Sequence, residues 1–142
     1  GEILVTPIQV LNYLNLLATR GFSYRPHLVM VDEPSKNNIP DLKNETWDRI
    51  ISDMRLIITD ENGTGKKAQP DILGMSIYGK TGTAENAHGE SHAWFIGWAE
   101  YVGNKYSLVI LLENAGSGGK VAAPIAKTIF KAIHRSENLV YK

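Results

Sequence analysis

Apolar residues change from a helical to a strand-like spacing about halfway along the chain. In the first half, a stripe of large apolar side chains with a period of 3.6 residues predicts a helix from about Glu45 to Thr59. An earlier helix is predicted to begin at Pro7, because Thr6 and Gln9 fit a capping box and proline suits the first helical position. Gly21 offers this first helix an end in the left-handed backbone region.

The second half is rich in β-branched and aromatic residues, which favour strands. Three strands are predicted: Ile72 to Ala84, His92 to Tyr101 and Tyr106 to Asn114. Gly103-Asn104 lies between the last two and indicates a hairpin, so we expect these strands to be antiparallel. A last helix is predicted from about Val121 to Arg135, after a loop at residues 116–119 that we expect to be flexible because three of its four residues are glycine.

The link between the first two helices is predicted to be mostly irregular. Tyr24 to Val31 is expected to be a short extended piece, because Arg25 precedes a proline and is pushed away from the helical region. Asp32 to Lys43 is expected to be a polar loop, since it contains Pro34 and Pro40. The resulting order of elements predicts an α+β fold, with helices packed on an antiparallel sheet.

Length and composition narrow the classes of protein. The 142 residues leave room for one domain or part of one, and the chain starts without Met in mid-pattern, so we expect a piece of a longer protein. Fifteen basic and fifteen acidic residues give zero formal charge, which argues against a nucleic-acid partner. There is no cysteine, which excludes disulfides and thiolate chemistry. The longest unbroken apolar run, Leu108 to Leu112, is too short for a membrane segment.

The segment from Gly74 to Thr81 satisfies the P-loop pattern G-x-x-x-x-G-K-[ST], so a nucleotide-binding protein is one hypothesis. A P-loop must follow a buried strand and open a helix, so that backbone N–H groups face the phosphates. Only Ile72-Leu73 could form the preceding strand, and the residues after Thr81 are poor helix formers. The context therefore disfavours this hypothesis.

The competing hypothesis places Lys80-Thr81-Gly82 on a strand, as the K-T-G element of active-site serine acyltransferases. A lysine on a strand edge would stabilise the proton-transfer network and a substrate carboxylate. The hydroxyls of Thr81 and Thr83 would bind that carboxylate, and the Thr83 N–H would donate to an oxyanion. Gly82 would let the backbone approach the helix that bears the nucleophile.

The surroundings of this triplet resemble those of a known family. The matching segments follow the family's order and cover nearly all of the chain: Gly1 to Gln9, Arg20-Gly21, Tyr78 to Glu85, His92 to Ala99 and Val109 to Ile129. The chain resembles the C-terminal half of the transpeptidase domain of a class B, elongation-type penicillin-binding protein. The resemblance implies that residues 1–142 form part of a serine DD-peptidase/β-lactamase-like fold, with the K-T-G strand along one wall of the cleft.

The same resemblance implies a function and its setting. The complete protein would be a D,D-transpeptidase acting on the D-alanyl-D-alanine end of peptidoglycan stem peptides, through a serine ester that β-lactams would also form. Its partners would be the stem peptide, β-lactams and proteins of cell-wall elongation. The domain would lie on the periplasmic side of an inner-membrane anchor that this chain does not include.

The nucleophile that the family needs is missing from the expected place. Its S-x-x-K and S-x-N motifs precede K-T-G, whereas Ser117-Gly118-Gly119-Lys120 follows it, in a loop where we expect no helix to aim the lysine. Ser35-Lys36-Asn37 precedes K-T-G but follows the first helix, which is the wrong order for the family. We therefore expect no transpeptidase activity from this chain alone. A non-catalytic α+β interaction module that keeps the cleft wall is a third hypothesis.

The sequence gives weaker evidence for a metal site and for aromatic contacts to a ligand. Glu85, His88, Glu90 and His92 lie close in sequence, but a glycine-containing loop does not hold them in a fixed geometry, so we expect no metal site and no cofactor. Trp94, Phe95 and Trp98 are expected to supply two core residues and one ligand contact. Trp94, nearest the loop, is the candidate for the cleft wall. The predicted catalytic residues are thus Lys80 and Thr83, with Thr81, Gly82 and Trp94 in substrate binding.

Overall fold

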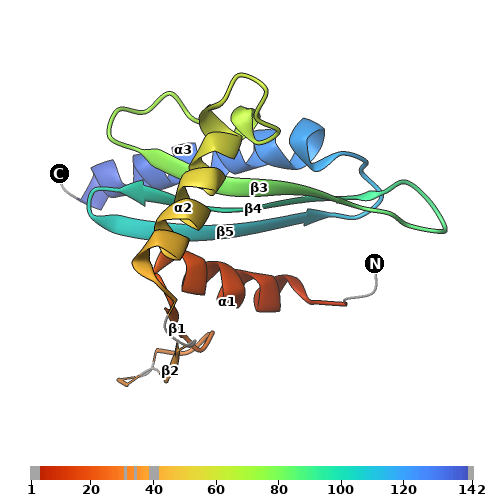
Figure 1. The fold of residues 1–142 in the computed structure, drawn as a ribbon. Coiled ribbons are helices and arrows are strands. Elements are labelled where there is room, and N and C mark those ends of the chain that lie inside the picture. Colours follow the sequence, from red (N-terminus) through yellow and green to blue (C-terminus); the bar gives the residue numbers. More distant parts are fainter. Residues whose placement is uncertain (1–3, 31, 34, 39–41, 141–142) are drawn as a thin grey trace.

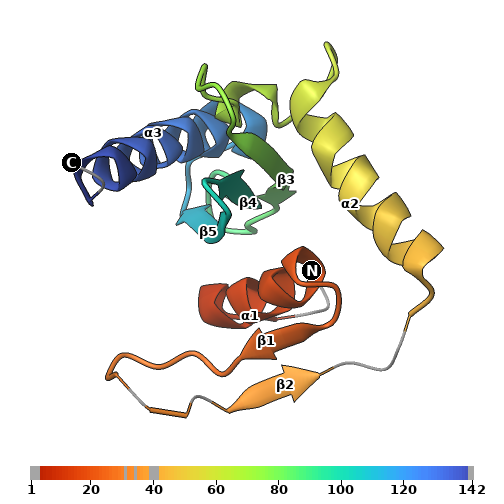
Figure 2. The ribbon, with the colours of Figure 1, turned by 90° about the vertical axis from the view of Figure 1, so that its left-hand side faces the viewer.

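The computed structural model describes residues 4–30, 32–33, 35–38 and 42–140. A three-stranded antiparallel sheet with the order β3-β4-β5 lies between two helices (Figures 1 and 2). The strands are β3 (Ser76–Ala84), β4 (His92–Tyr101) and β5 (Asn104–Leu112). Helix α3 (Ala123–Val140) covers one face of the sheet and α1 (Pro7–Ala18) covers the other. The predicted α+β arrangement is confirmed.

Helix α1 begins as its sequence predicts. The Gln9 N–H donates to the Thr6 hydroxyl and the Thr6 N–H donates to the Gln9 side chain, which completes the capping box. At the other end, Arg20 and Gly21 both have positive φ angles, of 60° and 113°. The Gly21 N–H donates to the Leu16 carbonyl at 2.8 Å, so the chain turns away from the helix here.

Helix α2 (Asn44–Thr59) confirms the second predicted helix within one residue. It crosses the outer side of β3 and leans across the layers of the molecule (Figure 2). Its apolar stripe therefore contributes to both cores: Trp47 and Met54 pack on the α1 side, and Ile58 packs on the α3 side. A short 3₁₀ turn, η1 (Lys66–Ala68), follows α2 and contacts α3.

Alternating side chains of the sheet supply these two cores. On the α3 side, Ile77, Phe95 and Phe130 are fully buried. On the α1 side, Trp98 and Leu14 are fully buried against the α2 residues. A sheet with both faces covered is held in one register, because a slip by one residue would exchange its two apolar sets.

The predicted hairpin between β4 and β5 is confirmed, but its turn lies one residue earlier than predicted. Tyr101 pairs with Asn104, so the turn consists of Val102 and Gly103, with φ angles of 50° and 77°. Asn104 is therefore the first residue of β5, not part of the turn. The strand also ends earlier than predicted, at Leu112.

The link between α1 and α2 differs from the prediction. The extended piece is β1 (Phe22–Tyr24), and it pairs with β2 (Lys36–Asn38) inside the expected polar loop. The buried Ser23 hydroxyl donates to Asn12 of α1 at 2.8 Å, which anchors β1. Pairing with the anchored β1 then makes a strand of Lys36–Asn38, whose residue types have weak strand propensity. The predicted end at Val31, the prolines at positions 34 and 40, and residues 1–3 of the N-terminal match lie outside the described residues.

The glycine-rich connection before α3 is ordered, contrary to the prediction of a flexible loop. A helical turn of the wide π type, η2 (Gly118–Ala122), begins at Gly118 and runs directly into α3. A Cβ on Gly118 would lie 2.3 Å from the carbonyl oxygens of both Gly82 and Trp94, so only glycine permits this close approach to the sheet. The last helix is also longer than predicted and continues to Val140. No helix in the described part of the chain is both long and apolar enough to cross a membrane.

Candidate functional site

The P-loop hypothesis is wrong, because its residues form a strand. Gly74 lies in a turn with a φ of 79°, and Ser76 to Ala84 pairs with β4 over its whole length. The element that follows is β4, not a helix. The backbone N–H groups of the motif therefore cannot converge on a phosphate at a helix N-terminus.

Among the described residues, no strand pairs with the outer side of β3, and α2 covers the beginning of that side. The Arg55 guanidinium of α2 donates to the Ile77 carbonyl at 2.7 Å and to the Gln69 side chain at 3.0 Å. In an antiparallel strand, the N–H and C=O of one residue point to the same edge, and the direction alternates from residue to residue. The backbone groups of Ile77, Thr81 and Thr83 therefore all point away from β4, to this outer edge.

The Lys80 side chain reaches the outer edge of β3. It is exposed, and its Nζ donates to the outward carbonyl of Thr81 at 2.6 Å. Tyr78, two residues before it on the same face, packs into the core on the α1 side. Lys80 is thus a cation at the rim of a rigid strand, beyond the part that α2 covers.

Thr81 points to the opposite face of the strand. It is 7% exposed, and its hydroxyl donates to the Thr64 hydroxyl at 2.7 Å. The described structure therefore gives this hydroxyl an internal partner, on the α3 side of the sheet. Its predicted contact with a substrate carboxylate stays a prediction.

Thr83 lies on the same face as Thr81 but is exposed. Its Oγ1 accepts the Gly118 N–H of η2 at 3.4 Å, a long hydrogen bond. Because the oxygen is the acceptor there, its own hydroxyl proton is left to be donated elsewhere. The outward N–H of the same residue lies at the same edge as the Lys80 ammonium.

Gly82 and Trp94 are direct cross-strand partners on the α1 side. A Cβ on Gly82 would lie 3.2 Å from the Trp94 Cβ, so the glycine makes room for the indole below it. A cavity of about 230 Å³ opens here, lined by Val5, Val10, Lys80, Thr81, Gly82, Trp94 and Ile96. Trp94 is half-buried at this cavity, whereas Phe95 and Trp98 are fully buried, which confirms two aromatic residues in the core and one at the surface.

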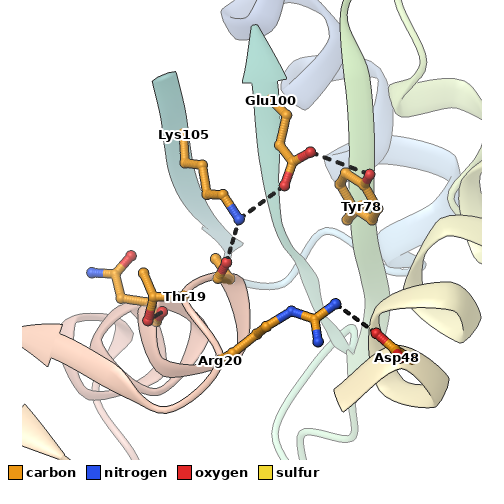
Figure 3. A network of polar contacts seen from close by, with 8 residues as sticks. Thr19, Arg20, Asp48, Tyr78, Glu100 and Lys105 are labelled. Atoms are coloured by element: carbon orange, nitrogen blue, oxygen red, sulfur yellow. Dashed lines mark hydrogen bonds and ion pairs between the residues drawn. The ribbon is translucent and has the colours of Figure 1, made fainter. Parts of the chain in front are cut away.

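A chain of polar contacts that was not predicted from the sequence links β3 to the end of α1 (Figure 3). Tyr78 stacks on Trp98 with ring centroids 4.8 Å apart, and its hydroxyl contacts Glu100 at 3.4 Å. Glu100 pairs with Lys105 at 3.0 Å, and the Lys105 ammonium donates to the Ala18 carbonyl at 2.6 Å. The cross-strand register of β3 and β4, which pairs Tyr78 with Trp98, was the available signal.

These surroundings change the pKa of the Tyr78 hydroxyl. Burial, followed by the nearby Glu100 carboxylate, raises the pKa of Tyr78 above its ordinary value, although the Arg55 guanidinium opposes the shift. The tyrosine is therefore a neutral hydrogen-bond donor over the physiological range. Its role is to fix β3, two residues before Lys80.

Neither the S-x-x-K sequence at residues 117–120 nor the S-x-N sequence at residues 35–37 forms a nucleophilic pair. Lys120 lies on the helical turn η2, so the expected loop is helical here. Lys120 is nevertheless exposed, and no hydrogen bond between its ammonium and the Ser117 hydroxyl is present in the part of the chain that the structure describes. Ser35-Lys36-Asn37 lies at the β1–β2 hairpin, beyond α1 from the sheet (Figure 2).

The loop after β3 shows no metal geometry. Among the described residues, no three His, Cys, Asp or Glu side chains gather where they could hold a metal ion. The Nδ1 atom of His92 instead accepts the Asn114 N–H at 3.0 Å. The Asn86 side-chain amide of the same loop donates to the Asn114 side chain at 2.6 Å.

Comparisons with known proteins point to one family. The family model for the penicillin-binding protein transpeptidase domain matches residues 1–131. The peptidoglycan D,D-transpeptidase MrdA of Haemophilus influenzae is 32% identical over 91% of this chain, which spans only 24% of that relative.

Two solved structures have the same fold. A crystal structure of Pseudomonas aeruginosa PBP2 in complex with WCK 5153 is 30% identical, with a TM-score of 0.75 over 93% of this chain and 30% of that one. A complex between PBP2 and MreC from Helicobacter pylori is 24% identical, with a TM-score of 0.74 over 93% of this chain and 26% of that one. On the extent of the family match, this chain belongs to the transpeptidase domain family of the penicillin-binding proteins.

Proposed function

We propose that this chain is the C-terminal portion of a peptidoglycan D,D-transpeptidase domain and supplies the K-T-G wall of its acyl-transfer site. The observation that carries the proposal is the position of Lys80, an exposed cation at the outer edge of β3, next to the outward N–H of Thr83. A regular strand holds both groups, so they are set in place before any substrate arrives. The family match supports the reaction class.

In this proposal a serine from the upstream part of the domain is the nucleophile. Its oxygen attacks the carbonyl of the D-alanyl-D-alanine bond, the terminal D-alanine leaves with a proton, and an ester remains. An amine of a neighbouring stem peptide then attacks the ester and releases the serine. The Thr83 N–H stabilises the oxyanion of each tetrahedral intermediate, and Lys80 stabilises the charges around it.

The substrate carboxylate is the proposed ligand of the remaining groups. The free hydroxyl proton of Thr83 is donated to it, and Lys80 supplies the opposite charge. Trp94 and Gly82 border the cavity beside Lys80 and contact the apolar part of the peptide. Thr81 joins the site only if its hydroxyl leaves Thr64 when substrate binds.

The partners and the location follow from the same proposal. Peptidoglycan stem peptides and β-lactams would bind the completed cleft, and a cell-wall elongation protein would bind elsewhere on the whole protein. Support for such a partner comes from the similar fold of the Helicobacter pylori PBP2 that was solved with MreC. The complete protein would be anchored in the inner membrane, with this region on the periplasmic side.

Acylation by a fluorescent penicillin tests the role of Lys80. In the complete domain, Lys80→Ala is expected to lower the second-order acylation rate constant roughly 10²- to 10³-fold, the usual cost of one electrostatic donor at such a site. Lys131→Ala removes an exposed lysine from α3 and is the matched control, expected to acylate at the wild-type rate. Equal rates for all three proteins would contradict the proposal. A wild-type domain that penicillin never labels would favour the non-catalytic module.

A further inference from the structure

We propose that Asn114 is a positioning residue for the acyl-transfer site. It ties the β5–η2 connection, residues 113–117, to the β3–β4 loop, residues 85–91, and so holds the Thr83 hydroxyl in place. The inference rests on the proposed function for its catalytic consequence. Its structural part rests on hydrogen bonds that join the two segments at one end of the sheet, where both lie in Figure 1.

Asn114 makes two of these hydrogen bonds itself. Its Oδ1 accepts from the Asn86 side-chain amide at 2.6 Å, and its N–H donates to His92 Nδ1 at 3.0 Å. One residue therefore contacts both the loop that leaves β3 and the first residue of β4. Because His92 Nδ1 is an acceptor here, the proton of a neutral His92 lies on Nε2.

The backbone of Asn114 explains why this position needs a particular residue. Its φ of 52° lies in the left-handed region, which asparagine, aspartate and glycine tolerate better than other residues. This conformation turns the chain so that the next two N–H groups, of Ala115 and Gly116, both donate to the Ser91 carbonyl, at 3.0 and 2.8 Å. Both ends of the β3–β4 loop are thus held from one side.

The same connection then reaches the proposed site. After Gly116 the chain enters η2, where the Gly118 N–H donates to Thr83 Oγ1. The position of the Thr83 N–H does not depend on this connection, because the pairing of β3 with β4 fixes the backbone at this residue. Loosening the connection should therefore disturb the hydroxyl that binds the carboxylate and leave the oxyanion donor in place.

Three substitutions separate the parts of this inference. Asn114→Gly keeps the left-handed backbone and removes the acceptor oxygen. Asn114→Asp keeps both the backbone tolerance and an acceptor oxygen for Asn86. Asn104→Gly removes an asparagine side chain at the opposite end of the sheet and is the control.

Hydrogen exchange of residues 85–91 is the first measurement, and it does not depend on activity. Asn114→Gly is expected to speed exchange in this loop roughly tenfold, the equivalent of about one lost hydrogen bond. Asn114→Asp and Asn104→Gly should leave the loop at the wild-type rate. Unchanged exchange in Asn114→Gly would overturn the inference, whatever the protein's activity.

Penicillin acylation of the complete domain is the second measurement. Asn114→Gly is expected to weaken the initial binding constant roughly tenfold and to keep the limiting acylation rate within about twofold, since only the carboxylate contact changes. Wild-type binding in Asn114→Gly, despite faster exchange, would overturn the positioning role and leave the proposed function intact. A wild-type domain that is never acylated would overturn the proposed function, and the catalytic part of this inference with it.

Discussion

The two halves of β3 pair with β4 in the same way but differ at their outer edge. In the first half, Arg55 of α2 closes the edge at the Ile77 carbonyl, and Tyr78 stacks on the buried Trp98. In the second half, the groups at the edge are the Lys80 ammonium and the outward backbone of Thr81 and Thr83. No strand in the described part of the chain pairs with this edge. In β3, a part of the edge that α2 covers is thus followed directly by a part that no described strand covers.

We expect the first half of β3 to matter mainly for stability and the second half mainly for the proposed function. Buried groups with internal partners hold β3 in position, and a long unpaired edge is normally covered or blunted in a stable protein. Polar groups left open at such an edge are available to a ligand or to another part of the domain. Substitutions in the first half should therefore change the free energy of unfolding, and those in the second half should change acylation.

The largest effect on stability is expected at Trp98 of β4, on which Tyr78 in the first half of β3 stacks. Trp98→Ala should lower the free energy of unfolding by about 3 to 5 kcal/mol, because it leaves a large cavity under Tyr78. Chemical denaturation of the 142-residue chain measures this. Trp94→Ala, on the same face but half-buried, is the control and should cost clearly less. Equal losses would mean that the two ends of the strand are equally buried.

A smaller loss is expected when the covered edge is opened. Arg55→Met keeps the length of the side chain and removes the donors to Ile77 and Gln69, so it should cost about 1 to 2 kcal/mol in the same denaturation experiment. Arg49→Met, on the same helix, breaks only an exposed ion pair with Asp53 and should cost less than about 0.5 kcal/mol. If both variants unfold alike, α2 does not protect the edge.

The smallest effect concerns Tyr78 and appears only at high pH. Its raised pKa means that the folded protein keeps the phenol proton when the unfolded chain, with a pKa near 10.0, begins to lose it. The resulting stability is present below pH 10 and is lost as the pH rises above it. Tyr78→Phe removes this titration, so the stability of the variant should fall less steeply than that of the wild type as the pH rises through and above 10. Parallel curves for the two proteins would contradict the assignment.

The elements that one local pattern determines could be predicted from the sequence. The capping box at Thr6, the apolar stripe of α2 and the hairpin near Gly103 depend on neighbours in the chain, and each led to the right element. The position of Lys80 on a strand was also predictable, because the residues after Thr81 exclude a helix. These features need no knowledge of distant contacts.

The features that depend on contacts between distant segments could not be predicted from the sequence. Three glycines at residues 116–119 suggested flexibility, but Gly118 serves close packing against Gly82 and Trp94. The same packing turns Thr83 toward Gly118, and the Thr64–Thr81 hydrogen bond likewise joins segments 17 residues apart. The Tyr78–Glu100–Lys105 chain needs two registers. The hairpin turn sets the one between β4 and β5, but the one between β3 and β4 depends on the longer loop at residues 85–91.

Mapping the penicilloyl ester tests the central claim most directly. The complete domain would be acylated with penicillin and digested, and the modified serine would be identified by mass spectrometry. If residues 1–142 supply only the K-T-G wall, the ester lies on a serine upstream of this chain, and every peptide from residues 1–142 is unmodified. An ester on Ser117, or on any other serine of these 142 residues, would contradict the account.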